Sequence, residues 1–419
     1  MLRTIFIVVN RSLKQFALST WITAVSIALA GGLLISIFLI QTQALAAFTG
    51  GSVGFDAVLG ARGSQLQLVL NTVFHLETSP GNIPWSMYKT ISKDKRVKLA
   101  IPYAVGDNYR GFRIVGTTDK IFTEFEYQVG KKLSVRRGRV FDSTRREAVI
   151  GSYVAKETGL KVGSIINPYH GFIFNENSKH EEEYVVTGIL QSTNSPTDRI
   201  ILIPIEGIFR MSGHVLRGAG QEYQAQANAE IDDKHKEVSA VMIKLHKNPL
   251  AGFQLQRLIN KQGKVASFAW PINKVIADFF SKMAWITKIL ELIAYLVAIV
   301  AMASIVASLY NTMNERKREF AILRTLGARK NIIFSIIVIQ STMIAFIGSI
   351  LSFIVAFVIM SLAKYITYTQ TGVVLEVFQY NIALVWVPLG MVALGAVAGF
   401  IPAIKAYRTD IAKNLLPSS

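Results

Sequence analysis

The chain contains no cysteine among its 419 residues. This absence excludes disulfide bonds, thiolate metal sites and cysteine nucleophiles. Three catalytic signatures are missing as well, namely the G-x-x-x-x-G-K-S/T phosphate loop, the G-x-S-x-G nucleophile elbow and the H-E-x-x-H zinc helix. The run Gly130-Lys131-Lys132 lacks the preceding glycine and the following hydroxyl of a phosphate loop. We therefore expect neither an enzyme nor a bound cofactor in this chain.

Acidic residues are scarce, with 27 Asp and Glu against 45 Lys and Arg, which gives a net charge of +18. A basic surplus is one mark of a nucleic-acid-binding protein. Here, however, many of the basic residues flank apolar runs, and no compact motif combines them with aromatic residues. Nucleic acid is not expected as a partner.

Four uncharged apolar runs are present, and one large polar block separates the first from the second. The runs are Trp21–Ile40, Leu292–Leu309, Ile332–Ala363 and Ile382–Ile404. A helix crosses the hydrocarbon core of a bilayer with about 20 apolar residues. The sequence therefore predicts a membrane protein with four transmembrane α-helices and a large α+β domain inserted between helices 1 and 2.

Basic residues in the short flanks predict the orientation, because cytoplasmic segments next to membrane spans are enriched in Lys and Arg. They form three clusters: Arg3, Arg11 and Lys14; Arg316, Lys317, Arg318, Arg324, Arg329 and Lys330; and Lys405, Arg408 and Lys413. With four spans the three clusters lie on one side of the membrane. Both termini are thus predicted to be cytoplasmic, and the polar block to lie outside.

These runs predict the order of segments along the chain. It comprises a cytoplasmic interfacial helix at 1–19, transmembrane helix 1 at 20–45, the outer α+β domain at 46–280, a stalk with transmembrane helix 2 at 281–313, a cytoplasmic loop at 314–331, transmembrane helix 3 at 332–364, a short outer loop at 365–381, transmembrane helix 4 at 382–404 and a cytoplasmic tail at 405–419. The outer domain is long enough to bury a core of its own and to divide into two subdomains.

Two features near the N-terminus affect this assignment. The first helix is assigned to the membrane interface because its apolar face lies opposite Arg11 and Lys14. That face holds Ile5, Val8, Val9, Leu13 and Phe16. Ala44-Leu45-Ala46 resembles a signal-peptide cleavage site, but the preceding apolar run is longer than the usual length of roughly 7–15 residues. We therefore expect an uncleaved span.

Local patterns in the outer domain predict both strands and helices. The predicted strands are Phe112–Thr117, Glu147–Ile150, Glu183–Leu190, Arg199–Ile205 and Ala240–Leu245, and the predicted helices are Ser152–Glu157 and Leu250–Gln262. Two polar stretches, Pro168–Glu183 and Gly218–Glu237, are predicted to be mobile loops.

The first of these loops contains candidate metal ligands. His170 and His180 lie there among acidic residues, and further candidates are Glu176, Glu181, Glu182, Glu183, His214 and His235. Imidazole and carboxylate ligands suit Zn²⁺. The spacing matches no established metal motif, however, and a solvated polar loop explains the same residues. The sequence therefore assigns no metal site, and His170 and His180 stay as candidates.

The cytoplasmic segment Asn314–Lys330 shows the strongest local pattern. Helical spacing places Phe320, Leu323 and either Leu326 or Gly327 on one face. Gly327 is also in position to end the helix. A helix bound to lipid headgroups and a helix docked on a partner protein both fit this pattern.

Small residues recur at every fourth position in two of the predicted spans. They are Ala24, Ala28, Gly32 and Ser36 in the first span, and Gly395 and Gly399 in the fourth. Such stripes allow membrane helices to approach each other closely. Packing within one chain, packing between chains and chance recurrence all fit the pattern.

The segment Asn314–Lys330 resembles the cytoplasmic loop of MacB/FtsX-like permeases, which are membrane subunits of a class of ABC transporters. The likeness extends to the tail at 401–411 and to the outer stretches Ala148–Gly151, Lys161–Ser164, Tyr184–Leu190 and Ile201–Pro204. Together with the predicted topology, the resemblance covers nearly the whole chain.

The resemblance implies a permease homodimer in the bacterial inner membrane, with its α+β domain in the periplasm. Two copies of a cytoplasmic ATPase, which bind ATP and Mg²⁺, are the implied partners. Because this chain has no fused nucleotide-binding domain, the ATPase is expected to be a separate polypeptide. The loop helix is expected to insert into an ATPase cleft, with Phe320, Leu323 and Leu326 buried, with Glu315, Arg316, Arg318, Glu319 and Arg324 in ion pairs at the rim, and with Gly327 at its end.

The implied function is to couple ATP hydrolysis to conformational work in the periplasm, such as export or extraction of an amphiphile, a peptide or a lipoprotein. The alternative is an FtsX-like regulator that activates a periplasmic partner without transporting a substrate. A periplasmic adaptor, a lipoprotein or a hydrolase, together with membrane lipid, are the further partners considered. The missing catalytic motifs disfavour a membrane-anchored periplasmic enzyme.

Overall fold

The computed structural model describes residues 2–49, 54–171, 174–211, 231–371, 374–377 and 379–408. The chain forms two compact units. The helical unit comprises Met1–Ala44, Met283–Tyr365 and Leu375–Ser419, and the sheet domain comprises Leu45–Lys282 and Ile366–Val374. Of the predicted mobile loop Gly218–Glu237, residues 218–230 lie outside the described residues.

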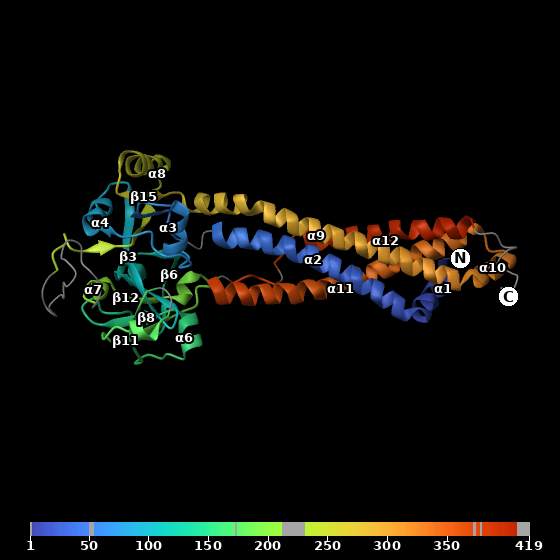
Figure 1. The fold of residues 1–419 in the computed structure, drawn as a ribbon, viewed down its shortest axis with the longest axis horizontal. Helices are drawn as coiled ribbons and strands as arrows, with labels where there is room; N and C mark the ends of the chain where they lie inside the picture. The colour runs from blue at the N-terminus through green and yellow to red at the C-terminus, as the bar shows by residue number, and fades with distance from the viewer. Residues whose placement is uncertain are drawn as a thin grey trace. The chain divides into compact units, whose positions relative to one another are not determined.

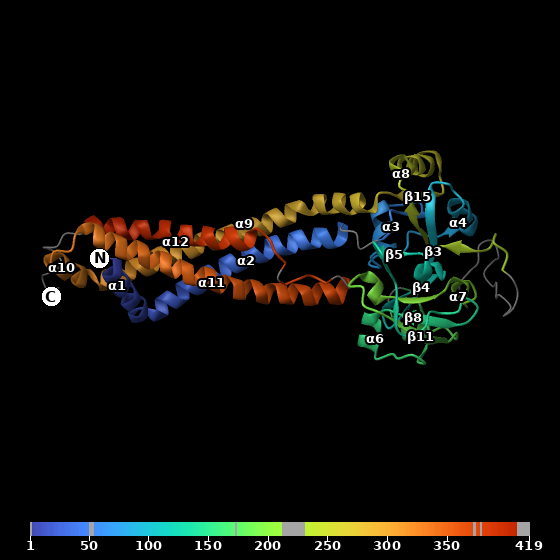
Figure 2. The same ribbon diagram turned by 180° about the vertical axis from the view of Figure 1, so that it is seen from behind.

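The helical unit is built from long apolar helices. Its helices are α1 (Leu2–Gln15), α2 (Ala17–Thr49), α9 (Ile272–Glu315), α10 (Lys317–Thr325), α11 (Lys330–Thr371) and α12 (Ala383–Arg408), of which α2, α9 and α11 also contribute residues to the sheet domain. Within this unit α2, α9, α11 and α12 run side by side, and α1 and α10 lie together at one end (Figures 1 and 2).

Four of these helices are long and apolar enough to cross a membrane. The segments are Ala17–Ala44, Ile272–Glu315, Lys330–Thr371 and Ala383–Tyr407, with mean hydropathy between 2.2 and 2.7. They contain the four apolar runs of the sequence, apart from Ile382 at one end. The predicted class, four transmembrane helices with an α+β domain between the first two, is confirmed.

The amphipathic helix α1 packs against its own chain. Ile5, Val9 and Leu13 are buried in the core of the helical unit, whereas Phe6 and Ile7 are about half exposed. Three of the five residues on the apolar face predicted to lie in the lipid interface are therefore covered by protein, and Val8 and Phe16 are partly covered. The reason is that a neighbouring helix surface offers the same burial of apolar area as lipid does.

The sheet domain contains an 11-stranded mixed sheet within the described residues. The main path runs β15 (Ala266–Ala269), β1 (Ala57–Ala61), β14 (Ala240–Leu245), β3 (Val97–Tyr109), β4 (Phe112–Thr117), β12 (Ile201–Pro204), β8 (Glu147–Ile150), β11 (Tyr184–Leu190) and β7 (Val135–Gly138). Off this path, β10 (Tyr169–His170) pairs with β3, and β9 (Ile165–Ile166) pairs with β11. The pairs β4/β12 and β8/β11 are parallel, and the other pairs are antiparallel.

Shorter elements surround this sheet. Two small sheets pair β2 (Ile83–Pro84) with β13 (Glu237–Val238), and β5 (Glu126–Gln128) with β6 (Lys131–Lys132). The helices are α3 (Gln65–Thr72), α4 (Trp85–Ser92), α5 (Lys120–Thr123), α6 (Ser152–Thr158), α7 (Ile205–Phe209) and α8 (Pro249–Gln256), with 3-10 helices η1 (Glu176–Ser178) and η2 (Pro196–Arg199) and a π-helix, η3 (Arg257–Gln262).

Both faces of the large sheet are buried. Along β3, Leu99 and Ile101 pack into one apolar cluster, while Ala100 and Ala104 pack into the other. All four residues of β12 are buried, which is why its sequence reads as a continuous apolar run.

The predictions for the outer domain match closely in several places. β4, β8 and β14 have the predicted bounds, β11 and β12 begin one and two residues later, and α6 ends one residue later than predicted. The predicted helix Leu250–Gln262 corresponds to α8 followed by η3. The central strand β3 was not predicted.

Candidate coupling site

The loop helix α10 is bounded by two distinct backbone turns. It begins after Arg316, whose dihedral angles are φ −99° and ψ 8°. It ends at Gly327, which adopts φ +95°. The amide of Gly327 donates to the carbonyl of Arg324 (3.1 Å), and the amide of Ala328 donates to that of Leu323 (3.0 Å). These two bonds form a Schellman motif, so the prediction that Gly327 ends the helix is confirmed.

The apolar face of α10 is turned toward its own chain. Phe320 is 9% exposed and packs with Leu323 in the core of the helical unit. Ile322, by contrast, is 45% exposed, and Leu326 is 79% exposed. In this chain alone, Phe320 and Leu323 therefore contact other helices of the same unit. Their contact with a partner stays a prediction, because helical spacing identifies an apolar face but not the surface that covers it.

The charged residues predicted at the rim of a docking site do not share one environment. Glu315, Arg318 and Glu319 are exposed, and Arg324 is partly exposed. Arg316 is buried. The outward surface of the loop, here called the loop face, consists of Glu315 at the end of α9, of Arg318, Glu319 and Ile322 on α10, and of Leu326, which follows α10.

Arg316 lies at the centre of a polar network that is buried at Ser12, Arg316 and Gln340 and exposed at Glu319. Its Nε donates to Glu319 Oε2 (2.8 Å), and its Nη1 donates to Ser12 Oγ (2.7 Å). Ser12 Oγ in turn donates to Gln340 Oε1 (3.1 Å), and the guanidinium lies 5.1 Å from the ring centre of Phe320. The network therefore joins α1, α10 and α11. Removing one member of such a buried network leaves polar partners unsatisfied, so the three helices are expected to move together.

Arg199 binds the C-terminal end of α11 within the sheet domain. Its Nη1 donates to the carbonyls of Tyr368 (3.3 Å) and Thr369. The guanidinium also lies 4.5 Å from the ring centre of Tyr153 on α6, and Tyr153 packs edge-on against the ring of Tyr368 (5.0 Å). The last carbonyls of a helix have no intrahelical donors and carry partial negative charge, so an arginine is a favourable partner there.

A rigid turn holds Arg199 in place. The neighbouring Asp198 is fully buried, and its carboxylate accepts hydrogen bonds from the amides of Thr193 (2.9 Å) and Asn194 (2.9 Å) and from the hydroxyl of Ser192 (2.9 Å). Gly151 approaches this turn so closely that an added Cβ would overlap the backbone of Asp198. The turn and the start of α6 therefore form one packed unit under the end of α11.

A cavity of about 400 Å³ adjoins this contact, and its lining includes His75, Arg113, Arg199 and Gln370. Burial, together with the charge of Arg113, lowers the pKa of His75 to about 3, so this imidazole is neutral at physiological pH. Burial lowers the pKa of Arg113 to about 10, which leaves it charged. The cavity wall therefore carries two arginines and one carboxylate, that of Glu77, beside the end of α11.

Two family models match this chain. The model of the MacB-like periplasmic core domain matches residues 20–247, which is more than half of the chain, and the model of the FtsX-like permease C-terminal region matches residues 291–411. The chain belongs to the MacB/FtsX-like ABC transporter permeases.

Individual relatives share only low sequence identity with this chain. The permease is 22% identical over 312 residues to the lipoprotein-releasing system transmembrane protein LolC of Haemophilus influenzae, a match that covers 70% of each chain. The periplasmic region of MacB from Actinobacillus actinomycetemcomitans matches 55% of this chain and 94% of its own, with 12% identity and a TM-score of 0.33. The extracellular domain of YknZ, a noncanonic ABC-type transporter from Gram-positive bacteria, matches 51% of this chain and 99% of its own, with 16% identity and a TM-score of 0.29.

The small residues of the permease pack within the chain. A Cβ added to Gly32 of α2 would lie 2.5 Å from Cβ of Val355 on α11, and one added to Gly395 of α12 would overlap Ala345 on α11. Gly399 approaches Ser341 on α11 in the same way. The other predicted packing positions, Ala24, Ala28 and Ser36, are buried. Of the readings left open by the sequence, intrachain packing on α11 is therefore the one seen at these glycines.

The candidate metal ligands do not all lie together. His170 and His180 lie together, beside Asp107 of β3. Glu176, Glu181–Glu183 and His235 do not belong to this group within the described residues, and His214 lies outside them. Asp107 was missed from the sequence because it precedes His170 by more than 60 residues.

Proposed function

We propose that this permease transmits the work of a separate cytoplasmic ATPase to its sheet domain on the opposite side of the membrane. The supporting observation is α11, an unbroken helix of 42 residues. It begins three positions after Gly327, and carbonyls of its last turn accept hydrogen bonds from Arg199. At 1.5 Å per residue this helix is about 63 Å long. We propose that a displacement of the loop helix reaches the sheet domain along this helix.

The proposed setting is the bacterial inner membrane, with both termini cytoplasmic and the sheet domain periplasmic. Support comes from the three basic clusters that flank the helices on one predicted side. We further propose that two permease chains assemble with two ATPase subunits, which bind ATP and Mg²⁺.

The proposed cargo is an amphiphile, a peptide or a lipoprotein, extracted from the outer surface of the membrane. The similarity to LolC, whose name places it in a lipoprotein-releasing system, supports this class. Mechanical work on the periplasmic side requires no passage of cargo through the helical unit.

The loop face is the proposed ATPase contact. Ile322 and Leu326 are its exposed apolar residues. The best apolar anchors of an interface contribute about 2 kcal/mol or more, and surface ion pairs contribute about 0–1 kcal/mol. Loss of such an anchor corresponds to roughly a 30-fold weaker affinity.

Co-purification with the candidate ABC ATPase tests the proposal. Leu326→Asp and Ile322→Asp should release the ATPase from the permease, because each places a charge in the apolar contact. Val129→Asp is the matched control, since Val129 is fully exposed on the sheet domain. If both loop variants retain the ATPase and stimulate its hydrolysis as the control does, the loop face is not the ATPase contact.

A further inference from the structure

Three potential metal ligands converge at one edge of the sheet domain. Asp107 Oδ1 lies 3.2 Å from His180 Nε2 and 3.4 Å from His170 Nδ1. One ligand atom from each of the three residues lies within 4.8 Å of the others. The three side chains come from β3, β10 and the segment after η1.

The backbone fixes two of these ligands by strand pairing. His170 of β10 lies opposite Asp107 of β3 in the antiparallel register. Asn108, the next residue of β3, is buried and donates from Nδ2 to the carbonyls of Tyr169 (3.3 Å) and Gly171 (2.9 Å). Its side chain therefore holds the backbone on both sides of His170.

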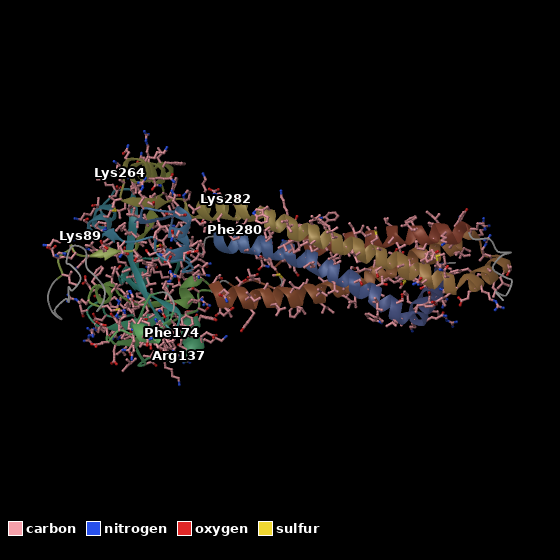
Figure 3. The ribbon with its side chains drawn as sticks, viewed as in Figure 1. Lys89, Arg137, Phe174, Lys264, Phe280 and Lys282 are labelled. Atoms are coloured by element: carbon pink, nitrogen blue, oxygen red, sulfur yellow. The ribbon has the colours of Figure 1, made fainter. Side chains whose placement is uncertain are left out.

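His180 is brought back to the same place by the end of its loop. Its amide donates to the carbonyl of Pro168 (2.8 Å), and the preceding Lys179 forms a β-bridge with Tyr169. The ring of Phe174, labelled in Figure 3, packs edge-on against that of Tyr169 at 4.7 Å. The described parts of this predicted mobile loop are thus tied to β3 and β10.

The three side chains differ in burial, with exposure rising from Asp107 to His180 to His170. Asp107 is fully buried, His180 is 7% exposed and His170 is 57% exposed. A buried carboxylate is costly unless a positive group or hydrogen bonds compensate its charge. The cluster therefore has a fixed anionic base and one exposed ligand through which an ion can enter.

We propose that Asp107, His170 and His180 bind a divalent transition-metal ion, with Zn²⁺ as the preferred ion. Zn²⁺ binds His nitrogen and carboxylate oxygen at about 2.0–2.2 Å, so two ligands of a tetrahedral ion lie about 3.3–3.6 Å apart. The two Asp–His distances fall close to this separation. The third pair of ligand atoms, on His170 and His180, lies within 4.8 Å.

Three protein ligands leave a fourth position of the ion open to water or to another donor. Two imidazoles with one carboxylate favour transition metals over Mg²⁺ and Ca²⁺, which prefer sites made of oxygen. The competing explanation is a hydrogen-bonded His–Asp–His cluster, which needs no ion.

Zinc titration of the purified full-length permease distinguishes the two explanations. The protein carries a purification tag without histidine, and a fluorescent chelator competes for the metal. We expect one Zn²⁺ per chain, unaffected by millimolar Mg²⁺. His170→Ala should weaken binding at least tenfold, because it removes a ligand from the ion. His246→Ala is the control, since His246 is an exposed histidine elsewhere in the sheet domain.

Co²⁺ provides a second readout that does not depend on the chelator. Four-coordinate Co²⁺ gives intense visible absorption, which His170→Ala should remove and His246→Ala should leave. Asp107→Asn keeps the shape of the buried side chain and should also weaken Zn²⁺ binding at least tenfold; His170→Ala decides the matter if that variant does not fold. Absence of stoichiometric Zn²⁺ binding in the wild type, or equal affinity in His170→Ala, overturns the proposal in favour of the hydrogen-bonded cluster.

Discussion

Replacing Arg199 with methionine tests whether the end of α11 is held by a charge. Methionine keeps a flexible apolar side chain against Tyr153 but removes the guanidinium. The variant thus loses the cation–π contact with Tyr153 and both hydrogen bonds to the last turn of α11. Neither α6 nor the turn anchored by Asp198 is altered.

The size of the effect follows from these contacts. A cation–π contact contributes about 0.5–2 kcal/mol, and hydrogen bonds from a charged donor contribute about 1.5–3 kcal/mol. Because the contacts share one side chain, their contributions do not add fully. We expect a loss of about 2–4 kcal/mol in the free energy of docking, which corresponds to at least a 30-fold more frequent opening of this turn.

Amide hydrogen exchange at residues 366–371 measures that opening directly. Exchange should accelerate about 30-fold or more in Arg199→Met, and ATP-dependent activity should fall while ATP hydrolysis persists. Arg137→Met is the control, because Arg137 is an exposed arginine of β7 in the same domain (Figure 3). Unchanged exchange at 366–371 in Arg199→Met would refute the role assigned to this arginine.

Three other substitutions test separate parts of the structure. Hydrogen bonds from Arg139 lower the pKa of Glu147 below its ordinary value of 4.5. The ionised carboxylate therefore stabilises the folded state above pH 4.5, and this contribution is lost as the pH falls through the lowered pKa. Glu147→Gln should therefore lower the free energy of unfolding by about 1 kcal/mol at pH 7, and the melting temperature of this variant should fall less steeply at acidic pH than that of the wild type. An unchanged dependence of the melting temperature on pH contradicts this. Gly395→Ala should destabilise the permease by about 1–3 kcal/mol through overlap with α11, and so lower its melting temperature, whereas Gly390→Ala, which meets no atom within 4 Å, should not; equal effects exclude close packing as the cause. Gly327→Ala should destabilise the end of α10 by about 1–2 kcal/mol because of its positive φ, seen as faster amide exchange in the loop, and unchanged exchange there would argue against this.

Patterns within short stretches of sequence predicted individual helices and strands. The positions of the candidate sites depend on contacts between residues far apart in the sequence. The apolar runs and strands β4, β8 and β14 follow from composition and alternation within short windows. β3 was missed because Lys98, Pro102 and Gly106 interrupt its pattern, although pairing with β14 and β4 stabilises it on both sides.

The candidate sites show the same limit. Spacing predicted an apolar face on α10, but the burial of Phe320 depends on how α10 packs against the other helices of its unit. His170 and His180 were visible as a pair, while Asp107 joins them only through the register of β3 and β10. Sequence patterns therefore identified chemically capable residues but not which of them meet.

The pairing of β1 with β15 has a mechanical consequence. β1 is the first strand after α2 and β15 is the last strand before α9, and Val58 lies opposite Ala269 in this antiparallel pair. A force that separates α2 from α9 therefore breaks the hydrogen bonds between β1 and β15 one after another, starting at the end nearest the two helices. Each bond contributes only about 0.5–1.5 kcal/mol net, so sequential rupture needs little force. β1 is also bound by β14 on its other side, whereas β15 is the edge strand of the path. Under load, β15 should peel first, leaving the rest of the sheet attached to α2.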